Sequence, residues 1–361
     1  ITAHYTENFN TLMEDIQTKK PTVILSVPRF LEKVYARMLT KIHEQPSWKR
    51  EVFNWAWNME KDADVLKNQK KSIPPFLAFK QRLARRYIFS GLKKGLGGRV
   101  RWMTAAGAPL SREIAELFNA GGVFVMEGYG LTECSGPVSL NVITSYRYGS
   151  AGRPLPCNQV KLAEDGEILI RGGNIFQGYW KNPDLTREAF TEDGWFKTGD
   201  IGSFDENGFL SVIDRKKDII ITSGGKNFSP QNIERLFLKD PLFDFFVVFG
   251  DRKPYLVALA VLNAAEAARI ARSKGIPFDS SEVLNGRTDF LALVDQHIAE
   301  KNQLLSRAST IKYYRLVHHP FSEERGELTP SLKIRRKAVM EHYHALIESM
   351  YPAVRSLDIF F

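Results

Sequence analysis

The string GYGLTECSG at residues 128–136 combines side chains that could bind a ligand. Glycines on both sides of Tyr129, including Gly130, let the backbone approach a ligand closely, and the tyrosine ring offers a flat face for stacking. Thr132 supplies a hydroxyl group, and Glu133 supplies a hard carboxylate oxygen that suits Mg²⁺ near phosphates. Taken alone, this string is about as typical of an ordinary turn as of a binding site.

Acidic residues farther along the chain could hold a sugar. The tripeptide TGD at 198–200 ends in Asp200, and Asp214 with Arg215 forms a second pair that could hold a sugar or a phosphate. We expect Asp200 to lie on a tight turn, where an aspartate usually caps or shapes the turn. The same carboxylate could instead accept two hydrogen bonds from a ribose diol, so both interpretations stay open on these residues alone.

A lysine near the end of the chain, Lys333, follows the turn-prone residues 329–331 in a basic stretch. By itself it is better interpreted as a solvated surface lysine. An ammonium group brought to a reacting phosphate would, however, stabilise the negative charge that develops there. The choice between the two interpretations depends on the rest of the chain.

The elements that would position these residues fall into three regions with different secondary-structure patterns. Residues 1–100 are predicted to be mostly helical. Beyond them, a buried strand at 123–126 and a helix expected over 112–119 indicate a parallel sheet with ligands near the carboxyl ends of its strands. Residues 149–213 contain short strand-like runs separated by Gly, Asp and Asn turns, which predict a small barrel or an antiparallel sheet.

The domain organisation follows from these secondary-structure patterns. We expect an α/β fold with part of a large domain at residues 1–217, made of an α/β region at 1–148 and the β-rich subdomain at 149–213. Strands and helices alternate again afterwards, which predicts a smaller α+β domain at 218–361. The boundary is placed at the charged run around Lys217.

Composition narrows the class of protein. The 361 residues are 43% hydrophobic and 25% charged, which is typical of a soluble globular protein. The net charge of +9 without a nucleic-acid signature favours a solvated surface, polyphosphate ligands or contact with an anionic membrane over nucleic acid. Cys134 and Cys157 lack metal-ligand spacing, so we expect a reducing compartment, the cytoplasm, with peripheral membrane contact as an open alternative.

Segments along nearly the whole chain resemble one family. The span from Asp193 to Ile221 closely resembles the signature segment of AMP-forming fatty acyl-CoA synthetases, which belong to the adenylate-forming superfamily. Nine segments occur in the family's order: PTVILSVPRFLEK, TAAGAPLS, GYGLTE, GSAGRPLP, GEILIRGGNIFQGYWKNPDLT, TGD, DRKKD, TSGGKNFSPQNIE and TPSLKIRR. A single segment would be weak support, but nine in order at sensible spacing leave little room for chance.

The resemblance implies a fold, a reaction and a set of roles. The fold would be an adenylate-forming domain, with a parallel sheet, helices and a small β-barrel subdomain, followed by a mobile C-terminal domain. The reaction would join a long-chain fatty acid to CoA through an acyl adenylate, with ATP, Mg²⁺ and CoA. The implied roles are adenine contact for Tyr129, Gly107 and Ala108, nucleotide contact for Gly130, α-phosphate contact for Thr132, Mg²⁺ binding for Glu133, ribose contact for Asp200 assisted by Arg215, the hinge for Lys217, adenylation for Lys333, and the CoA channel for Ser223, Gly224 and Gly225.

One family feature is absent. The phosphate loop, a string of the type TSGTTGxPK, does not occur among the 361 residues. We expect it to precede residue 1, which predicts a piece of a longer enzyme that is inactive or very weak alone; a naturally short, inactive form is the alternative. Ala105 and Ala106 stand where the family often has Ser and Gly, and this mild change preserves the close approach of backbone to base.

Two other functions compete with the CoA ligase. One is an acyl-AMP ligase that loads a carrier protein, and the other is a non-catalytic protein built on the same scaffold. The turn at 222–227 and the intact hinge weakly favour CoA, while Glu133, Asp200, Arg215 and Lys333 argue against a non-catalytic scaffold. Acyl chain length stays open, as does the oligomeric state, for which a dimer is one option.

Overall fold

The computed structural model describes residues 2–6, 11–68, 71–277, 287–329 and 332–351. The chain divides into two units, residues 1–213 and 214–361. None of the helices in the described ranges combines the length and the apolar composition that a membrane crossing requires.

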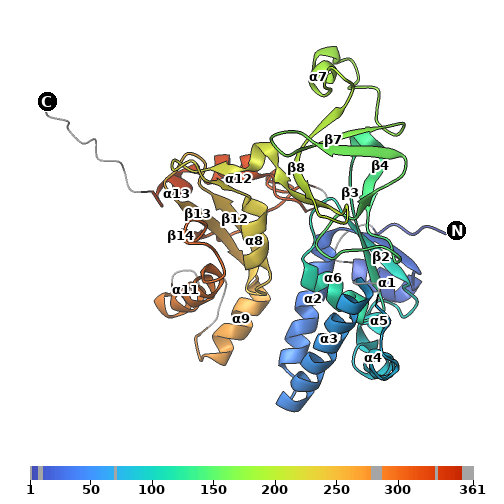
Figure 1. Ribbon diagram of the computed structural model, residues 1–361. Coiled ribbons are helices and arrows are strands. Elements are labelled where there is room, and N and C mark those ends of the chain that lie inside the picture. Colours follow the sequence, from blue (N-terminus) through green and yellow to red (C-terminus); the bar gives the residue numbers. More distant parts are fainter. Residues whose placement is uncertain (1, 7–10, 69–70, 278–286, 330–331, 352–361) are drawn as a thin grey trace. The chain divides into compact units, whose positions relative to one another are not determined.

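The first unit is built on a five-stranded mixed sheet (Figure 1). Its strands, in spatial order, are β1 (Val23–Ser26), β2 (Trp102–Ala106), β3 (Phe124–Leu131), β4 (Gly136–Leu140) and β5 (Arg153–Pro154). The first three strands run parallel, and β4 returns antiparallel to β3 as the second arm of a hairpin. Within the described residues β1 is an edge strand of this sheet, and its Leu25 exposes 77% of its surface.

The α/β part of the first unit also contains the helices α1 (Leu12–Lys19), α2 (Pro28–His43), α3 (Ser47–Asn68), α4 (Pro75–Tyr87), α5 (Ser90–Gly95) and α6 (Arg112–Ala120). Pro28 and Pro75 stand in the first turn of their helices, where a missing N–H costs nothing. The helix expected over 112–119 is confirmed as α6, which buries Leu117 and Phe118 completely.

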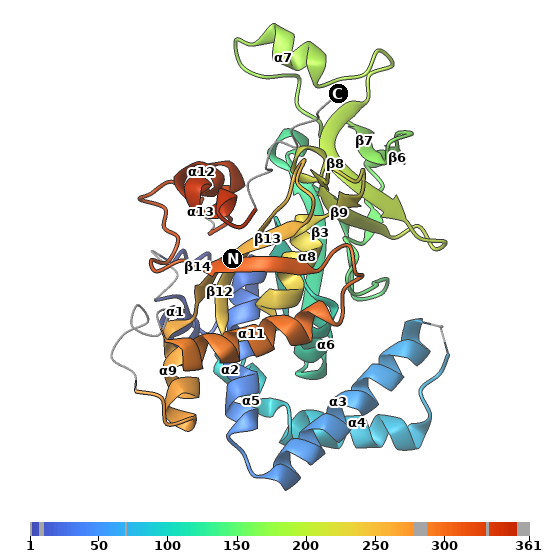
Figure 2. The same cartoon turned by 90° about the vertical axis from the view of Figure 1, so that its left-hand side faces the viewer.

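The helices α3 and α4 form a pair whose contact is held by buried polar groups (Figure 2). Glu60 of α3 is 2% exposed, and both of its oxygens accept hydrogen bonds from Arg85 of α4 at 2.8–2.9 Å. Gln81 donates a third hydrogen bond to Glu60 at 2.8 Å. Because a buried carboxylate needs such partners, these bonds fix how α4 lies on α3.

The β-rich part of the first unit is a curled four-stranded sheet of β6 (Asn158–Leu162), β7 (Glu167–Gly172), β8 (Phe196–Phe204) and β9 (Leu210–Arg215). The last two residues of β9 fall in the second unit. The short helix α7 (Pro183–Glu188) lies between β7 and β8 in the chain. Ile168, Ile170 and Phe196 are buried on one side of this sheet together with Val138 of β4. The two sheets of this unit therefore share part of one core.

The second unit has a three-stranded sheet at its centre. The strands are β12 (Phe243–Phe249), β13 (Leu256–Leu262) and β14 (Ile311–Leu316), with β13 antiparallel to β12 and parallel to β14. All seven residues of β13 are buried, because its alternate side chains enter two separate apolar clusters on the two faces of the sheet. Phe237 stacks flat on Phe246 in one of these clusters, with ring centroids 4.0 Å apart.

The other elements of the second unit are short. A single 3₁₀ turn, η2 (Lys216–Asp218), precedes the hairpin of β10 (Ile220–Ile221) and β11 (Asn227–Phe228). The helices are α8 (Pro230–Leu238), α9 (Ala264–Ser273), α11 (Thr288–Asn302), α12 (Arg336–His342) and α13 (His344–Glu348). The expected α/β fold is confirmed by this combination of sheets and helices.

Candidate functional site

A hydrogen bond between two distant strands joins the first two sequence motifs. The hydroxyl of Tyr129, on β3, donates to Oδ2 of Asp200, on β8, at 2.7 Å. Asp200 is only 6% exposed. Burial raises the pKa of Tyr129 far above its usual range, and the charge of Asp200 raises it further, so the phenol stays protonated and donating. The residues predicted from GYGLTE and from TGD therefore lie side by side.

The expectation that Asp200 lies on a tight turn is wrong. Thr198, Gly199 and Asp200 are part of strand β8. Gly199 has a φ of +69°, and the register between β7 and β8 shifts at this place. A bulge of this kind bends a strand and redirects a side chain without ending the strand, which is why the residues TGD have the composition of a turn.

The segment around Asp200 is fixed by its neighbours. The Thr198 hydroxyl donates to the carbonyl of Ile168 at 2.8 Å and accepts from the amide of Asp200 at 3.1 Å. The amide of Gly199 donates to Glu167 at 2.9 Å. Glu167 is itself 7% exposed. These contacts hold the Asp200 carboxylate in one place before any ligand arrives.

The glycines around Tyr129 have a role within the fold. A side chain at Gly130 would overlap the backbone of Gly136 and Pro137, which belong to the neighbouring strand β4. At Gly130, the backbone that comes close is therefore that of the other arm of the β3–β4 hairpin. Gly107, in contrast, has a φ of +88° and lies with Ala108 on an exposed turn directly after β2. Ala106, the last residue of β2, pairs with Gly128 of the parallel strand β3. The turn that begins at Gly107 therefore starts level with Tyr129.

Thr132 and Glu133 begin a single 3₁₀ turn, η1 (Thr132–Cys134), at the end of β3. Thr132 is exposed and Glu133 is half-buried. The hydroxyl of Tyr179 donates to Oε1 of Glu133 at 3.1 Å, and burial together with Glu133 raises the pKa of Tyr179. The amide of Phe176 donates to the carbonyl of Glu133 at 2.7 Å. The loop after β7 thus holds Glu133 in position.

The surroundings of Glu133 suit a magnesium ion that is shared with phosphates. No group of three or more His, Cys, Asp or Glu side chains that could hold a metal occurs among the residues with assigned positions. A single carboxylate is nevertheless what Mg²⁺ usually takes from a protein when waters and substrate phosphates supply its other ligands. Glu133 fits that role through the oxygen that does not accept from Tyr179.

The second unit carries the remaining predicted residues on exposed segments. Arg215 and Lys217 are exposed, at the end of β9 and in η2. Their neighbour Asp214 is buried, where its Oδ2 accepts a hydrogen bond from Ser229 at 2.6 Å. The residues Ser223, Gly224 and Gly225 form the exposed turn between β10 and β11, and Gly225 has a φ of +72°.

Lys333 lies on a tight turn of its own. The amide of Thr329 donates to the carbonyl of Lys333 at 2.8 Å, and the Lys333 amide donates to the Thr329 hydroxyl at 3.1 Å. Leu328 and Ile334 form a β-bridge on either side. The lysine side chain is exposed. Pro330 and Ser331, the other members of the predicted TPS turn, lie outside the described residues.

The sequence did not indicate two residues that position the site. Tyr179 holds Glu133, and Glu167 holds the backbone at Gly199. Tyr179 follows a glycine in the segment GYW, which resembles the GYG of the first motif, and this is the signal that could have indicated it. Glu167 follows a glycine turn at the start of β7 and carries no such signal.

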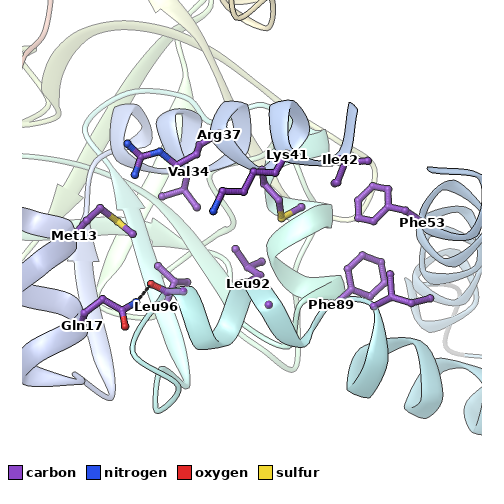
Figure 3. A pocket seen from close by; sticks show the side chains of 14 residues that line it. Met13, Gln17, Val34, Arg37, Lys41, Ile42, Phe53, Phe89, Leu92 and Leu96 are labelled. Carbon is purple, nitrogen blue, oxygen red and sulfur yellow. Dashed lines mark hydrogen bonds between the residues drawn. The ribbon is translucent and has the colours of Figure 1, made fainter. Parts of the chain in front are cut away.

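A separate hollow of about 460 Å³ lies between α1, α2, α3 and α5 (Figure 3). Its lining is mainly apolar and includes Phe53, Phe89 and Leu96. Arg37 and Lys41 of α2 supply its cationic groups. None of the site residues described above lines it.

Comparison with known proteins gives the family. The model of the "AMP-binding enzyme" family matches residues 1–180, and the model of the "AMP-binding enzyme C-terminal domain" matches residues 217–355. This chain belongs to the AMP-binding enzyme family. The resemblance inferred from the nine segments is thereby confirmed.

Curated relatives of this AMP-binding enzyme include the long-chain-fatty-acid–CoA ligase FadD15 of Mycobacterium bovis, which is 36% identical over 97% of the chain. Long-chain-fatty-acid–CoA ligase 1 of Cavia porcellus is 30% identical over 95% of the chain. The chain spans 58% of the length of the first relative and 50% of the second.

Among solved structures, the adenylation domain of a carboxylate reductase from Mycobacterium chelonae superposes with a TM-score of 0.68 at 22% identity. The superposed part makes up 96% of this AMP-binding enzyme and 49% of the carboxylate reductase chain. At this identity the likeness concerns the fold, and it agrees with the adenylate-forming fold expected from the sequence.

Proposed function

We propose that a protein containing this chain is a long-chain fatty acid–CoA ligase of the AMP-forming kind. The fatty acid carboxylate would attack the α-phosphate of ATP to form an acyl adenylate, with release of pyrophosphate. The thiol of CoA would then lose its proton and attack the acyl carbonyl to form the thioester, with release of AMP. The hydrogen bond between Tyr129 and Asp200 carries the proposal, because it brings together an aromatic face and a buried carboxylate. Relatives named as long-chain ligases, at 30–36% identity, support the proposed substrate class.

The nucleotide would lie beside β3. In this proposal the adenine packs between the ring of Tyr129 and the turn of Gly107 and Ala108, and Gly130 contributes backbone. Asp200 would accept the two ribose hydroxyls, since a carboxylate oxygen has more than one lone pair and Tyr129 occupies only part of this capacity. Arg215 would assist it from the second unit.

The phosphates would lie beyond the end of β3. Thr132 is proposed to donate its hydroxyl to the α-phosphate, and Glu133 to hold the Mg²⁺ that accompanies ATP. When bound, Mg²⁺ neutralises part of the phosphate charge. Tyr179 would keep the Glu133 carboxylate turned toward that position through its 3.1 Å hydrogen bond.

The second unit would supply the groups that change between the two half-reactions. Lys333 is proposed to stabilise the charge that develops as the carboxylate attacks the α-phosphate, as a preorganised ammonium group does most effectively. The turn of Ser223, Gly224 and Gly225 would line the path of the CoA pantetheine, and Lys217 would be the hinge between domains at 1–217 and 218–361. An exposed lysine in a one-turn 3₁₀ helix suits a hinge, since few contacts must break when it rotates.

We further propose that the protein works in a reducing compartment, the cytoplasm. Cys134 is buried and Cys157 is exposed, and both carry free thiols. A protein that functions where disulfides form rarely leaves an exposed thiol unpaired.

The test is a product assay with ATP, Mg²⁺ and palmitate, with and without CoA, followed by mass spectrometry. It is run on the 361-residue chain and on the same chain fused behind a segment that carries a phosphate loop of the type TSGTTGxPK. Palmitoyl-CoA and AMP that form only with CoA support the proposal. Acyl-AMP that accumulates regardless of CoA would favour a carrier-loading ligase instead. The absence of AMP with every acyl length would overturn the ligase assignment.

Lys333→Ala is the informative variant in this assay, and Lys337→Ala is its matched control. Both lysines are exposed, and they lie four residues apart in the sequence. If the first variant loses adenylation and the second retains it, a specific role for Lys333 is supported. Equal loss in both would mean that only general charge matters.

A further inference from the structure

The outer side of the α3–α4 pair exposes seven large apolar side chains. They are Trp48, Val52 and Trp55 of α3 and Phe76, Phe79, Leu83 and Tyr87 of α4, and each exposes between 41% and 73% of its surface. We call these seven residues the α3–α4 face. Large exposed apolar side chains that gather on one part of a protein usually mark an interaction site.

Helical spacing gathers these residues on one side of each helix. Trp48, Val52 and Trp55 follow one another by four and three positions, which places them on one face of α3. Their neighbour Phe53 is buried and lines the hollow on the inner side (Figure 3). The apolar groups that serve the core of α3 are therefore distinct from those that point outward.

One lysine connects the exposed aromatic groups of the two helices. The ammonium of Lys80, on α4, lies 6.0 Å from the ring centroid of Trp55 and 4.2 Å from that of Phe76. This lysine bridges the aromatic groups of both helices. Because Glu60 and Arg85 fix the contact between α3 and α4, the face is held as a unit.

Positive charge accompanies the apolar groups. The sequence of α4 contains Lys80, Arg82, Arg85 and Arg86 and no acidic residue. Arg85 is paired with Glu60. Lys80, Arg82 and Arg86 make no ion pair within the part of the chain that the structure describes, and Arg86 lies over the ring of Tyr87. Three cations are therefore left for a partner with negative charge.

We propose that the α3–α4 face binds the surface of an anionic lipid membrane. Tryptophan, tyrosine and phenylalanine are suited to the boundary between lipid headgroups and acyl chains, and lysine and arginine are attracted to anionic headgroups. Side chains that combine both properties on an amphipathic helix lie in the plane of that boundary. The proposal goes beyond the ligase function and does not depend on it, since membrane binding is measured without catalysis.

The experiment is sedimentation of the 361-residue protein with vesicles that mix phosphatidylglycerol and phosphatidylcholine, compared with pure phosphatidylcholine. Binding is expected to the mixed vesicles and to weaken with added salt. The triple variant Lys80→Gln, Arg82→Gln, Arg86→Gln should bind roughly tenfold more weakly or worse, because each cation near an anionic surface contributes. Its matched control neutralises exposed cations of the second unit, with Arg272→Gln, Lys274→Gln and Lys312→Gln.

The apolar contribution is tested in the same way. Trp55→Ala, Phe76→Ala and Phe79→Ala together should also weaken binding by roughly tenfold or more, since each loses buried apolar area at the membrane. The matched control removes exposed apolar groups elsewhere, at Ile143, Trp180 and Leu304, and should bind as the parent does. Thermal unfolding of every variant is compared with the parent, and exposed positions are expected to leave it unchanged.

Tryptophan fluorescence gives an independent measurement. Lipids brominated in the acyl chains should quench the parent protein, and Trp48→Phe with Trp55→Phe should remove most of that quenching. The proposal is overturned if the α3–α4 variants and their controls bind vesicles equally, or if quenching persists in the double variant. It is also overturned if mixed vesicles bind no protein while the apolar triple variant abolishes a concentration-dependent self-association, which would identify a second copy as the partner.

Discussion

In the first unit, Tyr129 and Asp200 are joined by a 2.7 Å hydrogen bond and Asp200 is buried, whereas in the second unit Lys333 and the turn at 223–225 are exposed. The proposed roles match this difference. A base and a ribose must be held in one geometry throughout the reaction, so their contacts benefit from preorganised groups. A lysine that assists one half-reaction and must leave before the next benefits from a segment with few packing restraints.

The segment of Lys333 shows how closely the two kinds of residue are interleaved. Arg336, three positions later, donates to Glu234 at 2.7 Å and to the carbonyl of Val248 at 2.6 Å. Glu234 is 6% exposed and also accepts from the amide of Val248. Arg336 therefore anchors the start of α12, and Lys333 projects from the turn before it. Replacing these two residues should separate stability from activity.

The largest effect on stability is expected from Arg336→Ala. Removing this cation leaves the Glu234 carboxylate buried with an incomplete set of partners, and breaking such a pair costs about 3–5 kcal/mol. Urea unfolding of the second unit measures the loss. Lys337→Ala, at a position whose side chain is 87% exposed, is the control and should change stability by less than about 0.5 kcal/mol. A loss of equal size in both variants would show that Arg336 is no anchor.

Lys333→Ala should have the converse effect. In a form of the protein that adenylates palmitate, we expect the rate of adenylate formation to fall by about 10²–10³, as it does when one preorganised charge-stabilising donor is removed. The free energy of unfolding should stay within about 0.5 kcal/mol of the parent, because the side chain is exposed. Transfer of a preformed acyl adenylate to CoA should be affected far less. A large loss of stability would contradict the contrast with Arg336.

Tyr129→Phe tests the hydrogen-bonded site of the first unit, and its effect on stability should be smaller than that of Arg336→Ala. The ring remains, and only the hydrogen bond to the buried Asp200 is lost, so the unfolding free energy should fall by about 1–2 kcal/mol. Nucleotide affinity should weaken by less than about tenfold, since stacking is retained. Tyr179→Phe, which removes the hydrogen bond to the half-buried Glu133, is the comparison and should cost less stability. The reverse order would mean that Asp200 does not depend on Tyr129.

The smallest effect is a pH dependence in the second unit. His297 Nδ1 lies 2.7 Å from Asp240 Oδ2, and this hydrogen bond raises the pKa of His297 above its ordinary value of 6.5. Burial acts to raise the pKa of Asp240, but the bond to His297 and the nearby Lys301 outweigh it and the net shift is downward. The histidine contribution is thus complete below its unfolded pKa and is lost as pH rises through the raised folded value, while Asp240 stays ionised.

His297→Gln measures this contribution. The stability difference between parent and variant should be larger at about pH 6 than at about pH 9, by about 1 kcal/mol. Glu300 and Lys301 also act on the pKa of His297, in opposite directions, and both remain in the variant. His318→Gln serves as the control for the loss of an imidazole outside this pair. A constant difference for His297→Gln across the range would contradict a charged pair.

The sequence predicted the layout of the fold well because its signals are local. Pro28 and the apolar spacing after it indicate α2, and the buried run at 123–126 indicates the start of β3. The turn assigned to Asp200 was wrong because a glycine with positive φ, such as Gly199, can serve in a bulge as well as in a turn, and composition does not separate the two. Tyr179 was missed because its contact with Glu133 depends on the folding of a distant loop.

The open edge of β1 affects the behaviour of the isolated chain in concentrated solution. Its backbone N–H and C=O groups on that side meet no strand within the described residues, and Leu25 adds an exposed apolar side chain. An apolar, uncharged edge such as VILS is a template on which an extended segment of another molecule can add a strand. Slow intermolecular strand addition, suppressed by dilution or by Leu25→Lys, is therefore the aggregation route to expect during storage.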